Sequence, residues 1–221
     1  MSQVLIGGID EAGRGPVIGP MVMAIAVLDE KAAGQLAELG VKDSKKMTLA
    51  KRERLYPVIT KVAAEYATEH VSASKIDRMR KKMSLNQLEA EECGLLIMGL
   101  GSKVQKVIID STDPVAEKYR ARIEDFMKLR GAKTIPPLVC EHKADDNHIQ
   151  ASAASVLAKV ERDRAIEELK EEWGEFGSGY PADPLTKEFL KRLMSDGKLP
   201  DFVRKSWNTV VRNQQTGLSD F

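Results

Sequence analysis

The apolar run MVMAIAVLD, at residues 21–29, restricts the possible folds more than any other stretch of this sequence. Eight apolar side chains follow one another before the first polar residue, Asp29. A strand with no alternating polar positions has both of its faces buried. This run therefore predicts an interior strand in a sheet that is covered on both sides.

Shorter apolar runs and helical patterns alternate over about the first 170 residues, as in α/β proteins. Further strands are predicted at residues 4–10, 66–72, 106–110 and 134–140. Helices are predicted at 48–65, with Thr48 as N-cap, and at 85–100, 115–130 and 149–170. After the break GSGYP at 177–181, helices are predicted from Asp183-Pro184 to 194 and over 201–212. The pattern predicts an α/β sheet domain followed by a C-terminal helical appendage.

The length and composition agree with a globular chain. The 221 residues suit one sizeable domain, with or without a smaller appendage. No apolar run approaches the roughly 18 residues of a membrane span, and the N-terminus lacks the features of a signal peptide. Cys93 and Cys140 have neither zinc-site nor disulfide-framework spacing. We expect a cytoplasmic protein with no membrane association.

Overall charge does not identify a partner, because the formal net charge is +1. Residues 180–213 carry seven Lys or Arg and four Asp or Glu, which is a mild basic patch. Such a patch suits nucleic acid, but an ordinary solvated helix surface has the same composition. Both interpretations stay open on this count.

Acidic residues follow three of the predicted strands. Asp10 and Glu11 end the first, Asp110 ends the fourth, and Asp145 and Asp146 follow the fifth. Ligands of open α/β sheets gather at the carboxyl ends of strands, and a cluster of carboxylates there would suit Mg²⁺ or Mn²⁺ with a phosphate substrate. Alone, Asp110 could belong to a capping turn and Asp145-Asp146 to a polar capping loop. The pair Asp10-Glu11 is harder to explain structurally, since no helix follows it directly.

The glycines after the first acids do not indicate a dinucleotide site. Residues 13–19, GRGPVIG, resemble G-x-G-x-x-G, but the last spacing is one residue too long. A predicted strand follows instead of the helix N-terminus that binds pyrophosphate. Walker A, H-E-x-x-H and G-x-S-x-G motifs are absent from the sequence, and the three histidines, His70, His142 and His148, show no zinc spacing.

Taken together, the motifs resemble the type 2 ribonucleases H (ribonuclease HII), and GSGYPADP and VRKSW resemble archaeal members. The resemblance covers most of the chain in family order. The matching segments are DEAGRGP at 10–16, DSK at 43–45, Ile109-Asp110, KAD at 143–145, AASVLAKV at 153–160, Arg162-Asp163, GYP at 179–181 and RKSW at 204–207.

The resemblance implies a ribonuclease H-like fold, with a five-stranded mixed sheet flanked by helices and a small C-terminal helical domain. It divides the chain into a catalytic domain at 1–176, a helical substrate-binding region at 177–213 and a tail at 214–221. We expect a monomer.

The resemblance also implies an endonuclease that cuts RNA in RNA/DNA hybrids and at ribonucleotides embedded in duplex DNA. Its metal ligands and catalytic acids would be Asp10, Glu11, Asp110 and Asp145. The choice of Asp145 over Asp146 rests on a spacing of ten residues to Ser155. Two metal ions can hold both oxygens of an in-line displacement, which would leave 3′-hydroxyl and 5′-phosphate ends.

Substrate-binding residues are implied at five positions, namely Gly13, Arg14, Gly15, Lys45 and Tyr180. Glycines allow close approach of the backbone to a sugar, and the 2′-hydroxyl distinguishes RNA from DNA. In this interpretation Tyr180 packs on the sugar at the RNA–DNA junction and Lys45 meets a phosphate. Without the resemblance, Tyr180 could instead be a tyrosine wedged at a domain boundary and Lys45 an ordinary surface lysine.

The C-terminus resembles a sliding-clamp (PCNA) interaction peptide without its final aromatic residue. Gln215 would be the polar anchor, with Leu218 and Phe221 as apolar anchors; a frayed terminus carrying these residues by chance is the alternative.

For the whole chain, two rival functions remain: a nucleic-acid-binding module that does not cut, and another metal-dependent nuclease of the same fold. The four acids disfavour the first, and the Gly13–Gly15 loop with Tyr180 disfavours the second.

Overall fold

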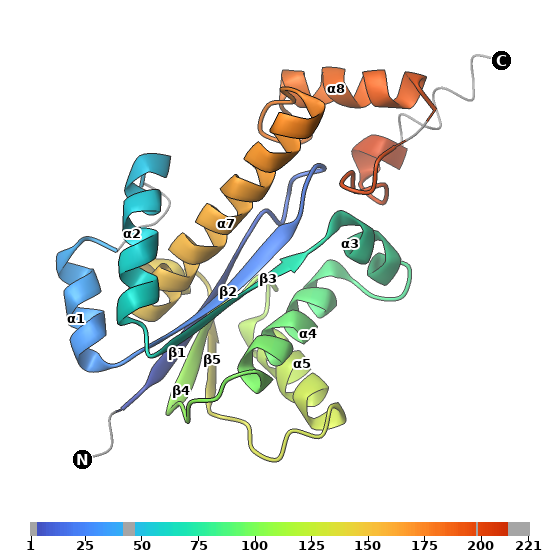
Figure 1. Ribbon diagram of the computed structural model, residues 1–221. Coiled ribbons are helices and arrows are strands. Elements are labelled where there is room, and N and C mark those ends of the chain that lie inside the picture. The colour runs from blue at the N-terminus through green and yellow to red at the C-terminus, as the bar shows by residue number, and fades with distance from the viewer. Residues whose placement is uncertain (1–3, 42–46, 198, 212–221) are drawn as a thin grey trace. The chain divides into compact units, whose positions relative to one another are not determined.

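A five-stranded mixed sheet organises the chain (Figure 1). The computed structural model describes residues 4–41, 47–197 and 199–211. The strands are β1 (Ile6–Ala12), β2 (Met21–Leu28), β3 (Glu65–Val71), β4 (Lys106–Asp110) and β5 (Leu138–Glu141), in the order β3-β2-β1-β4-β5. β1 is antiparallel to β2, whereas β4 is parallel to both β1 and β5. The predicted five-stranded mixed sheet is confirmed, and every residue of β2 is buried.

Helices connect and cover these strands. They are α1 (Glu30–Glu38), α2 (Leu49–Val62), α3 (Ala73–Arg80), α4 (Leu85–Met98), α5 (Ala116–Leu129), α6 (Ala144–Asn147), α7 (Ile149–Trp173) and α8 (Pro184–Ser195). Both predicted N-caps are confirmed. The Thr48 hydroxyl accepts from the Lys51 amide at 3.3 Å, and the Asp183 carboxylate accepts from the Leu185 amide at 2.9 Å. Within the described residues, every helix is too short or too polar to cross a bilayer.

Several predicted elements need correction. β1 extends to Ala12, so the first two acids lie inside the strand and not at its end. β5 begins only at Leu138, because Pro136 and Pro137 lack the amide that a ladder needs. The helix predicted at 201–212 is confirmed only for 208–211; residues 201–207 form turns and a bridge instead. The short helices α1, α3 and α6 were not predicted.

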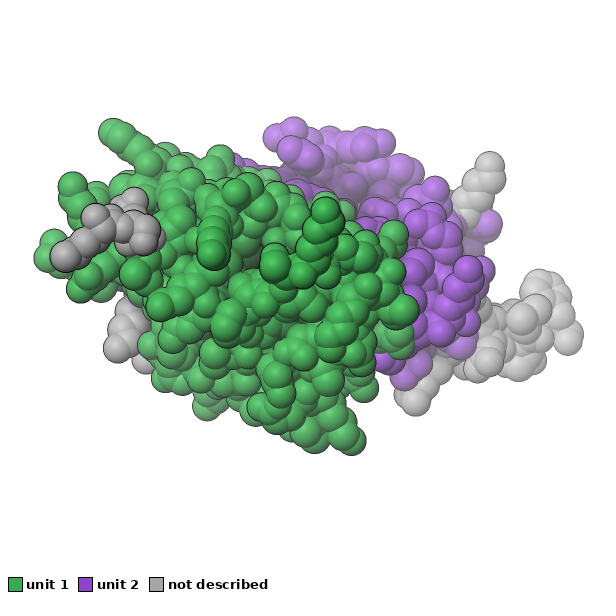
Figure 2. Space-filling view, turned by 90° about the horizontal axis from the view of Figure 1, so that it is seen from below, with its two compact units in different colours: residues 1–12, 22–69, 85–161 green, residues 13–21, 70–84, 162–221 purple. Residues whose placement is uncertain are grey.

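The chain forms two compact units (Figure 2). Unit 1 comprises residues 1–12, 22–69 and 85–161. Unit 2 comprises residues 13–21, 70–84 and 162–221. The predicted domains at 1–176, 177–213 and 214–221 concern roles in catalysis and binding, and they stay a prediction.

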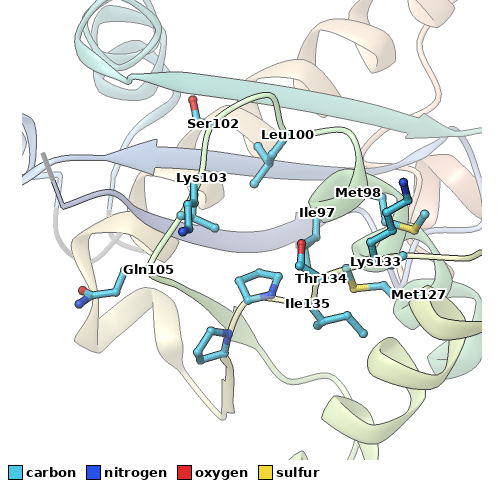
Figure 3. A pocket seen from close by; sticks show the side chains of 14 residues that line it. Ile97, Met98, Leu100, Ser102, Lys103, Gln105, Met127, Lys133, Thr134 and Ile135 are labelled. Atoms are coloured by element: carbon cyan, nitrogen blue, oxygen red, sulfur yellow. The ribbon is translucent and has the colours of Figure 1, made fainter. Parts of the chain in front are cut away.

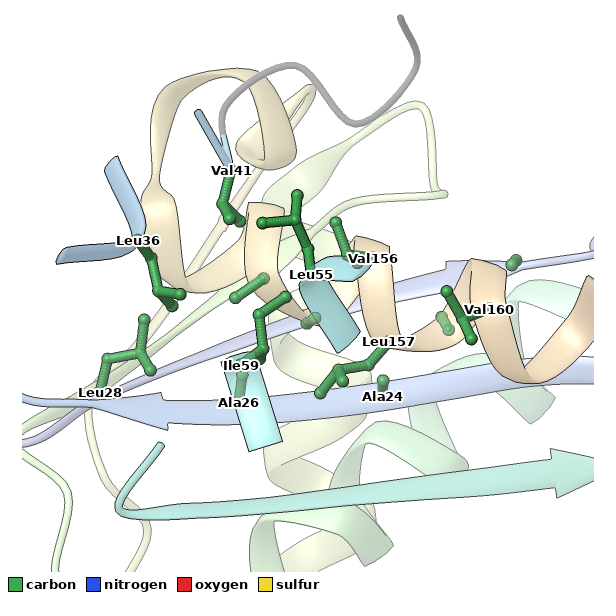
Figure 4. Packing of buried hydrophobic residues seen from close by; sticks show 14 of the residues in the cluster. Ala24, Ala26, Leu28, Leu36, Val41, Leu55, Ile59, Val156, Leu157 and Val160 are labelled. Carbon is green, nitrogen blue, oxygen red and sulfur yellow. The ribbon is translucent and has the colours of Figure 1, made fainter. Parts of the chain in front are cut away.

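The core of unit 1 lies between the sheet and the helices α1, α2 and the first half of α7 (Figure 4). Ala24 and Ala26 of β2 pack there with Val156 and Leu157 of α7. A Cβ on Gly8 of β1 would lie 2.1 Å from a backbone carbon of α7. The small residues at the start of α7 therefore let the helix pack closely against the sheet, as predicted.

Unit 2 has its own apolar core. Val17 and Ile18 pack with Phe176, Phe189 and further buried residues of α7, α8 and the C-terminal segment. The rings of Phe176 and Phe189 lie 5.3 Å apart, and the Ile18 backbone forms an isolated bridge with Val203. This core holds the residues that follow β1 against the second half of α7 and the C-terminal segment.

Candidate functional site

Asp10 and Glu11 begin on opposite faces of β1, because side chains alternate along a strand. Gly8 faces α7, and Asp10 shares its face; Asp10 is only 5 % exposed. Glu11 starts on the other face and is half-buried. Its charge raises the pKa of Cys93, which is buried on α4, although burial of the thiol is the larger cause. The two adjacent acids thus meet different surroundings.

Asp110 lies beside Asp10 on the neighbouring strand. The parallel register pairs Ile9 with Ile109, so the next residue of each strand is an aspartate. The Ala144 amide donates to Asp110 Oδ1 at 2.8 Å, which orients this carboxylate.

Asp113 orders the turn after β4, and α5 itself begins after Val115 without a side-chain cap. The Asp113 carboxylate accepts from the Val115 amide at 3.1 Å and from the Asn86 side chain at 3.2 Å, and it pairs with Arg122. These contacts hold the pKa of Asp113 below its usual value. Asp113 therefore organises the turn at residues 110–114, while the Asp110 carboxylate accepts from the Ala144 amide at the start of α6.

Asp145 completes a group of three carboxylates. It lies in the single turn of α6 and is 1 % exposed, whereas Asp146 is half-buried. Lys143, just before α6, has a left-handed backbone with φ 60°. The polar loop expected at this point is thus a short helix, and it places Asp145 near enough for its charge to act on Asp10.

The pKa of Asp10 is raised to about 7. Burial is the largest cause, and the charges of Asp110 and Asp145 add to it. A hydrogen bond from Ser155 and the charge of Lys159 act in the opposite direction. The fold therefore holds like charges together in a buried place, a common feature of functional sites.

Ser155 and Lys159 are site residues that the sequence reasoning missed. They lie four residues apart on α7, and Lys159 Nζ donates to Ser155 Oγ at 2.9 Å. Ser155 is fully buried. The available signal was a polar pair at i, i+4 in the otherwise apolar stretch AASVLAKV at 153–160.

Glu89 of α4 is a further buried acid in unit 1. Thr112, two residues after Asp110, donates its hydroxyl proton to Glu89 Oε2 at 2.8 Å. Together with Glu11, Glu89 raises the pKa of Tyr119, again with burial as the largest cause. This contact ties the segment after β4 to α4.

The side chains as they stand are not arranged as a finished metal site. Among residues 4–41, 47–197 and 199–211, no three His, Cys, Asp or Glu side chains form a group that could hold an ion. The structure thus brings Asp10, Asp110 and Asp145 together electrostatically, with Glu11 starting on the opposite face of β1.

The loop at residues 13–15 lies in unit 2 and is held through its backbone oxygens. The buried guanidinium of Arg204 donates to the carbonyls of Gly13, Arg14 and Gly19 at 2.6, 2.9 and 3.1 Å. Trp207 Nε1 donates to the Gly15 carbonyl at 3.0 Å. One arginine and one indole therefore fix the loop in place.

Gly13 and Gly15 are required by close contacts. Gly13 has φ 80°, and a Cβ there would lie 2.8 Å from the Pro20 oxygen. A Cβ on Gly15 would lie 3.3 Å from the Tyr180 ring. At Gly15 the loop thus places backbone, with no side chain, beside an aromatic ring.

Tyr180 is 45 % exposed, so its ring is available for contact. The guanidinium of Arg162 lies 5.8 Å from the ring centroid, and Arg162 Nη2 donates to the Ser178 carbonyl at 3.1 Å. Ser178 in turn donates to Asp183, whose pKa is lowered to about 2 by these bonds. Hydrogen bonds on both sides of Tyr180 therefore hold its backbone.

Lys45 and the tail residues Gln215, Leu218 and Phe221 lie outside the described residues.

A cavity of about 600 Å³ lies at the other end of β4 (Figure 3). Ile97, Leu100 and Ile135 line it, with Lys103 and Lys133. These residues precede β4 and β5 or end α4, whereas ligands of such sheets bind at the carboxyl ends of strands. The cavity is therefore separate from the carboxylates.

The order of the mixed five-stranded sheet, with aspartates on the adjacent strands β1 and β4, places the chain in the ribonuclease H-like fold class. The family model described as Ribonuclease HII matches residues 7–210. A curated Ribonuclease HII of Pyrococcus horikoshii is 43 % identical over 211 residues, covering 95 % of this chain and 93 % of the relative. The chain belongs to the ribonuclease HII family, whose members are endoribonucleases that degrade RNA in RNA/DNA hybrids, and it is a hydrolase.

Solved structures agree. The crystal structure of ribonuclease H2 from Pyrococcus horikoshii is 41 % identical, with a TM-score of 0.88, and the match covers 96 % of this chain and 98 % of that one. The PCNA:RNase HII complex from Archaeoglobus fulgidus is 38 % identical, with a TM-score of 0.82 and coverage of 93 % and 96 %. The ribonuclease H-like fold and the resemblance to archaeal members are confirmed.

Proposed function

We propose that this chain cuts both RNA within RNA/DNA hybrids and single ribonucleotides embedded in duplex DNA, leaving 3′-hydroxyl and 5′-phosphate ends. The observation that supports it most is the buried group of Asp10, Asp110 and Asp145, in which burial, with the charges of Asp110 and Asp145 adding to it, raises the pKa of Asp10 to about 7. A fold that holds like charges together in this way suits a cationic cofactor and a phosphodiester substrate.

The cofactor would be Mg²⁺ or Mn²⁺, held by Asp10, Glu11, Asp110 and Asp145. The donor chemistry fits, because hard divalent cations prefer carboxylate oxygens. When bound, two such ions would activate the attacking water and stabilise the leaving 3′-oxygen. Their charge would also offset the repulsion that raises the pKa of Asp10.

Other residues of unit 1 would keep these carboxylates oriented. Ser155 holds Asp10 by a hydrogen bond, while Lys159 holds Ser155 and favours the ionised form of Asp10. The Ala144 amide holds one oxygen of Asp110. Asp10 and Asp110 would thus enter the reaction in defined orientations, which is worth several kcal/mol in comparable sites.

Recognition of the ribose would fall to the loop at 13–15 and Tyr180. The exposed ring beside Gly15 offers a surface for a sugar, and the backbone of Gly13–Gly15 can approach the 2′-hydroxyl. Arg14 and Lys45 would contact phosphate. In this proposal residues 1–176 carry the catalytic acids and 177–213 bind the duplex.

The test uses a DNA duplex with one ribonucleotide, an all-DNA duplex of the same sequence and an RNA/DNA hybrid. Each is incubated with the protein in Mg²⁺, in Mn²⁺ and in EDTA, and the cut positions and end groups are mapped. We expect cutting only of the two ribose-containing substrates and only with metal. Binding without cutting in either metal would favour the rival non-cutting module, and cutting of the all-DNA duplex would favour another nuclease of the same fold.

We also propose that residues 214–221 bind a sliding clamp, with Gln215, Leu218 and Phe221 as anchors. The solved complex of the Archaeoglobus fulgidus relative with PCNA supports a clamp as partner. Deleting 214–221 should abolish clamp binding and leave the cutting of short hybrids unchanged. A matched control replaces Thr216 and Ser219, which are not anchors, by alanine; equal clamp binding by the deletion variant and wild type would refute the proposal.

A further inference from the structure

The end of α3 and the residues after it form a basic surface in unit 2. Arg78, Arg80, Lys81 and Lys82 are all exposed. The only acid among residues 73–84 is Asp77, and its two oxygens accept from the backbone amides of residues 205 and 206 at 2.7 and 2.9 Å. The acid is therefore turned toward the protein while the cations face solvent.

This basic surface is joined to the loop at 13–15 through one side chain. The guanidinium of Arg80 lies 4.9 Å from the ring centroid of Trp207. The same indole donates to the Gly15 carbonyl at 3.0 Å. With Asp77 holding the backbone just before Trp207, the cations keep a defined position relative to Gly15.

A purely structural role explains only part of this composition. A cation in the last turn of a helix stabilises the helix dipole, and Arg78 and Arg80 occupy that turn. Lys82 follows the C-cap Lys81 and lies beyond the helix. Four exposed cations in five residues repel one another, so an anionic partner is expected to stabilise them.

We propose that Arg78, Lys81 and Lys82 bind the phosphate backbone of the substrate duplex on one side of the bound ribonucleotide. This inference rests on the proposed function. Phosphates of one strand follow each other at roughly 3.4 Å along the helix axis. The Trp207 indole contacts both Gly15 and Arg80. Phosphates a few nucleotides from the ribose are therefore within reach of Arg78, Lys81 and Lys82.

The test compares two triple variants with equal loss of charge. One replaces Arg78, Lys81 and Lys82 by serine, leaving Arg80 on Trp207. The control replaces Lys118, Lys128 and Arg130 by serine, which are exposed on or just after α5 in unit 1. Binding to a duplex with one ribonucleotide is measured in EDTA from 50 to 300 mM salt, and cutting is measured with Mg²⁺.

We expect the Arg78/Lys81/Lys82 variant to bind about 10- to 100-fold more weakly at low salt and to lose about 2–3 from the slope of log affinity against log salt. Its KM should rise while kcat stays near that of wild type. The control should match wild type in all three quantities. Equal salt slopes for the two triple variants would overturn the inference.

Truncated duplexes distinguish a contact with phosphates on one side of the ribonucleotide from a nonspecific effect of the protein's net charge. Shortening the duplex on one side of the ribonucleotide to two base pairs should remove the difference between the two triple variants, and shortening it on the other side should not. Persistence of the difference after both truncations would overturn the proposal. Failure of the wild-type protein to cut any ribose-containing duplex would instead refute the proposed function, so the two failures are separable.

Discussion

The carboxylate group of unit 1 and the loop at 13–15 of unit 2 are organised by opposite means. Asp10, Asp110 and Asp145 are like charges held together, and burial, with the repulsion of Asp110 and Asp145 adding to it, raises the pKa of Asp10 to about 7. The loop carbonyls instead accept from Arg204 and Trp207 and are satisfied within the protein. The first group brings like charges together in a buried place, whereas the second satisfies carbonyl acceptors with donors of the protein.

This difference separates two kinds of contribution to function. Removing a charge from the carboxylate group should relieve repulsion and leave the fold intact, while abolishing chemistry. Removing a donor from the loop should leave buried acceptors unsatisfied, which costs stability.

Asp110→Asn should reduce metal-dependent cutting by about 10³-fold or more, because a neutral amide is a poor ligand for a hard divalent cation. The amide oxygen can still accept from the Ala144 amide, so stability in EDTA should equal or exceed that of wild type. Cutting rates and urea unfolding give the two readouts. Substantial residual turnover would contradict the role of Asp110, and a large loss of stability would contradict the contrast.

Arg204→Met should lower the free energy of unfolding by roughly 3 kcal/mol or more, because three carbonyls lose the donors of one buried guanidinium. Arg204→Lys is the matched control. It keeps the charge but cannot reach three acceptors, so it should recover only part of the stability. If Arg204→Lys were as stable as wild type, charge and not the donor geometry would hold the loop.

The sequence predicted much of the sheet because burial patterns along single strands are local. β2 and β4 were predicted to within one residue at each end, since an unbroken apolar run or an apolar run ending in Asp110 leaves few alternatives. The short α1 and α3 were missed, because their few turns give little periodic signal. The helix predicted over 201–212 does not form before 208 because the backbone amides of 204, 205 and 206 instead donate to Val17 and Asp77.

The sequence predicted which residue types form the candidate site, but it did not predict how their side chains are arranged in space. Asp10, Asp110 and Asp145 stand out as acids near strand ends. The opposite starting faces of Asp10 and Glu11 follow from the extension of β1 to Ala12, which the sequence pattern did not show. Ser155, 145 residues from Asp10 in sequence, meets it only through tertiary packing. Lys45 and the tail stay predictions.

Asp10→Asn should remove part of the pH dependence of stability. The pKa of Asp10 is about 7 in the folded chain and 3.8 as the ordinary value. Between these values the folded state binds more protons than the unfolded state, so stability falls as pH rises through this range. In EDTA, wild type should lose on the order of a few kcal/mol relative to Asp10→Asn between pH 5 and 8.

Urea unfolding of both proteins across that range measures the difference, and groups other than Asp10 cancel in it. Adding Mg²⁺ or Mn²⁺ should reduce the loss in wild type and have less effect on Asp10→Asn. Parallel stability curves for the two proteins in EDTA would show that folding does not raise the pKa of Asp10.

Gly15→Ala should have the smallest effect and act on recognition more than on stability. The new Cβ would lie 3.3 Å from the Tyr180 ring, a contact that the half-exposed ring can relieve by a small shift. The loss of stability should therefore be under about 1 kcal/mol. Because the shift moves the ring and adds bulk beside the loop, the rate of cutting at a single ribonucleotide should fall about 10-fold or more.

Gly15→Ala is compared with Gly15→Ala in a Tyr180→Leu background, where the ring that the methyl group would contact is absent. If the methyl group acts by displacing the ring, it should cost much less activity in that background. An equal loss in both backgrounds would show that Gly15 acts by direct backbone approach to the sugar. Neither substitution changes a residue of unit 1, so the metal dependence of the remaining cutting should match that of wild type. A changed metal dependence would show that the loop at 13–15 and the carboxylate group do not contribute independently to the reaction.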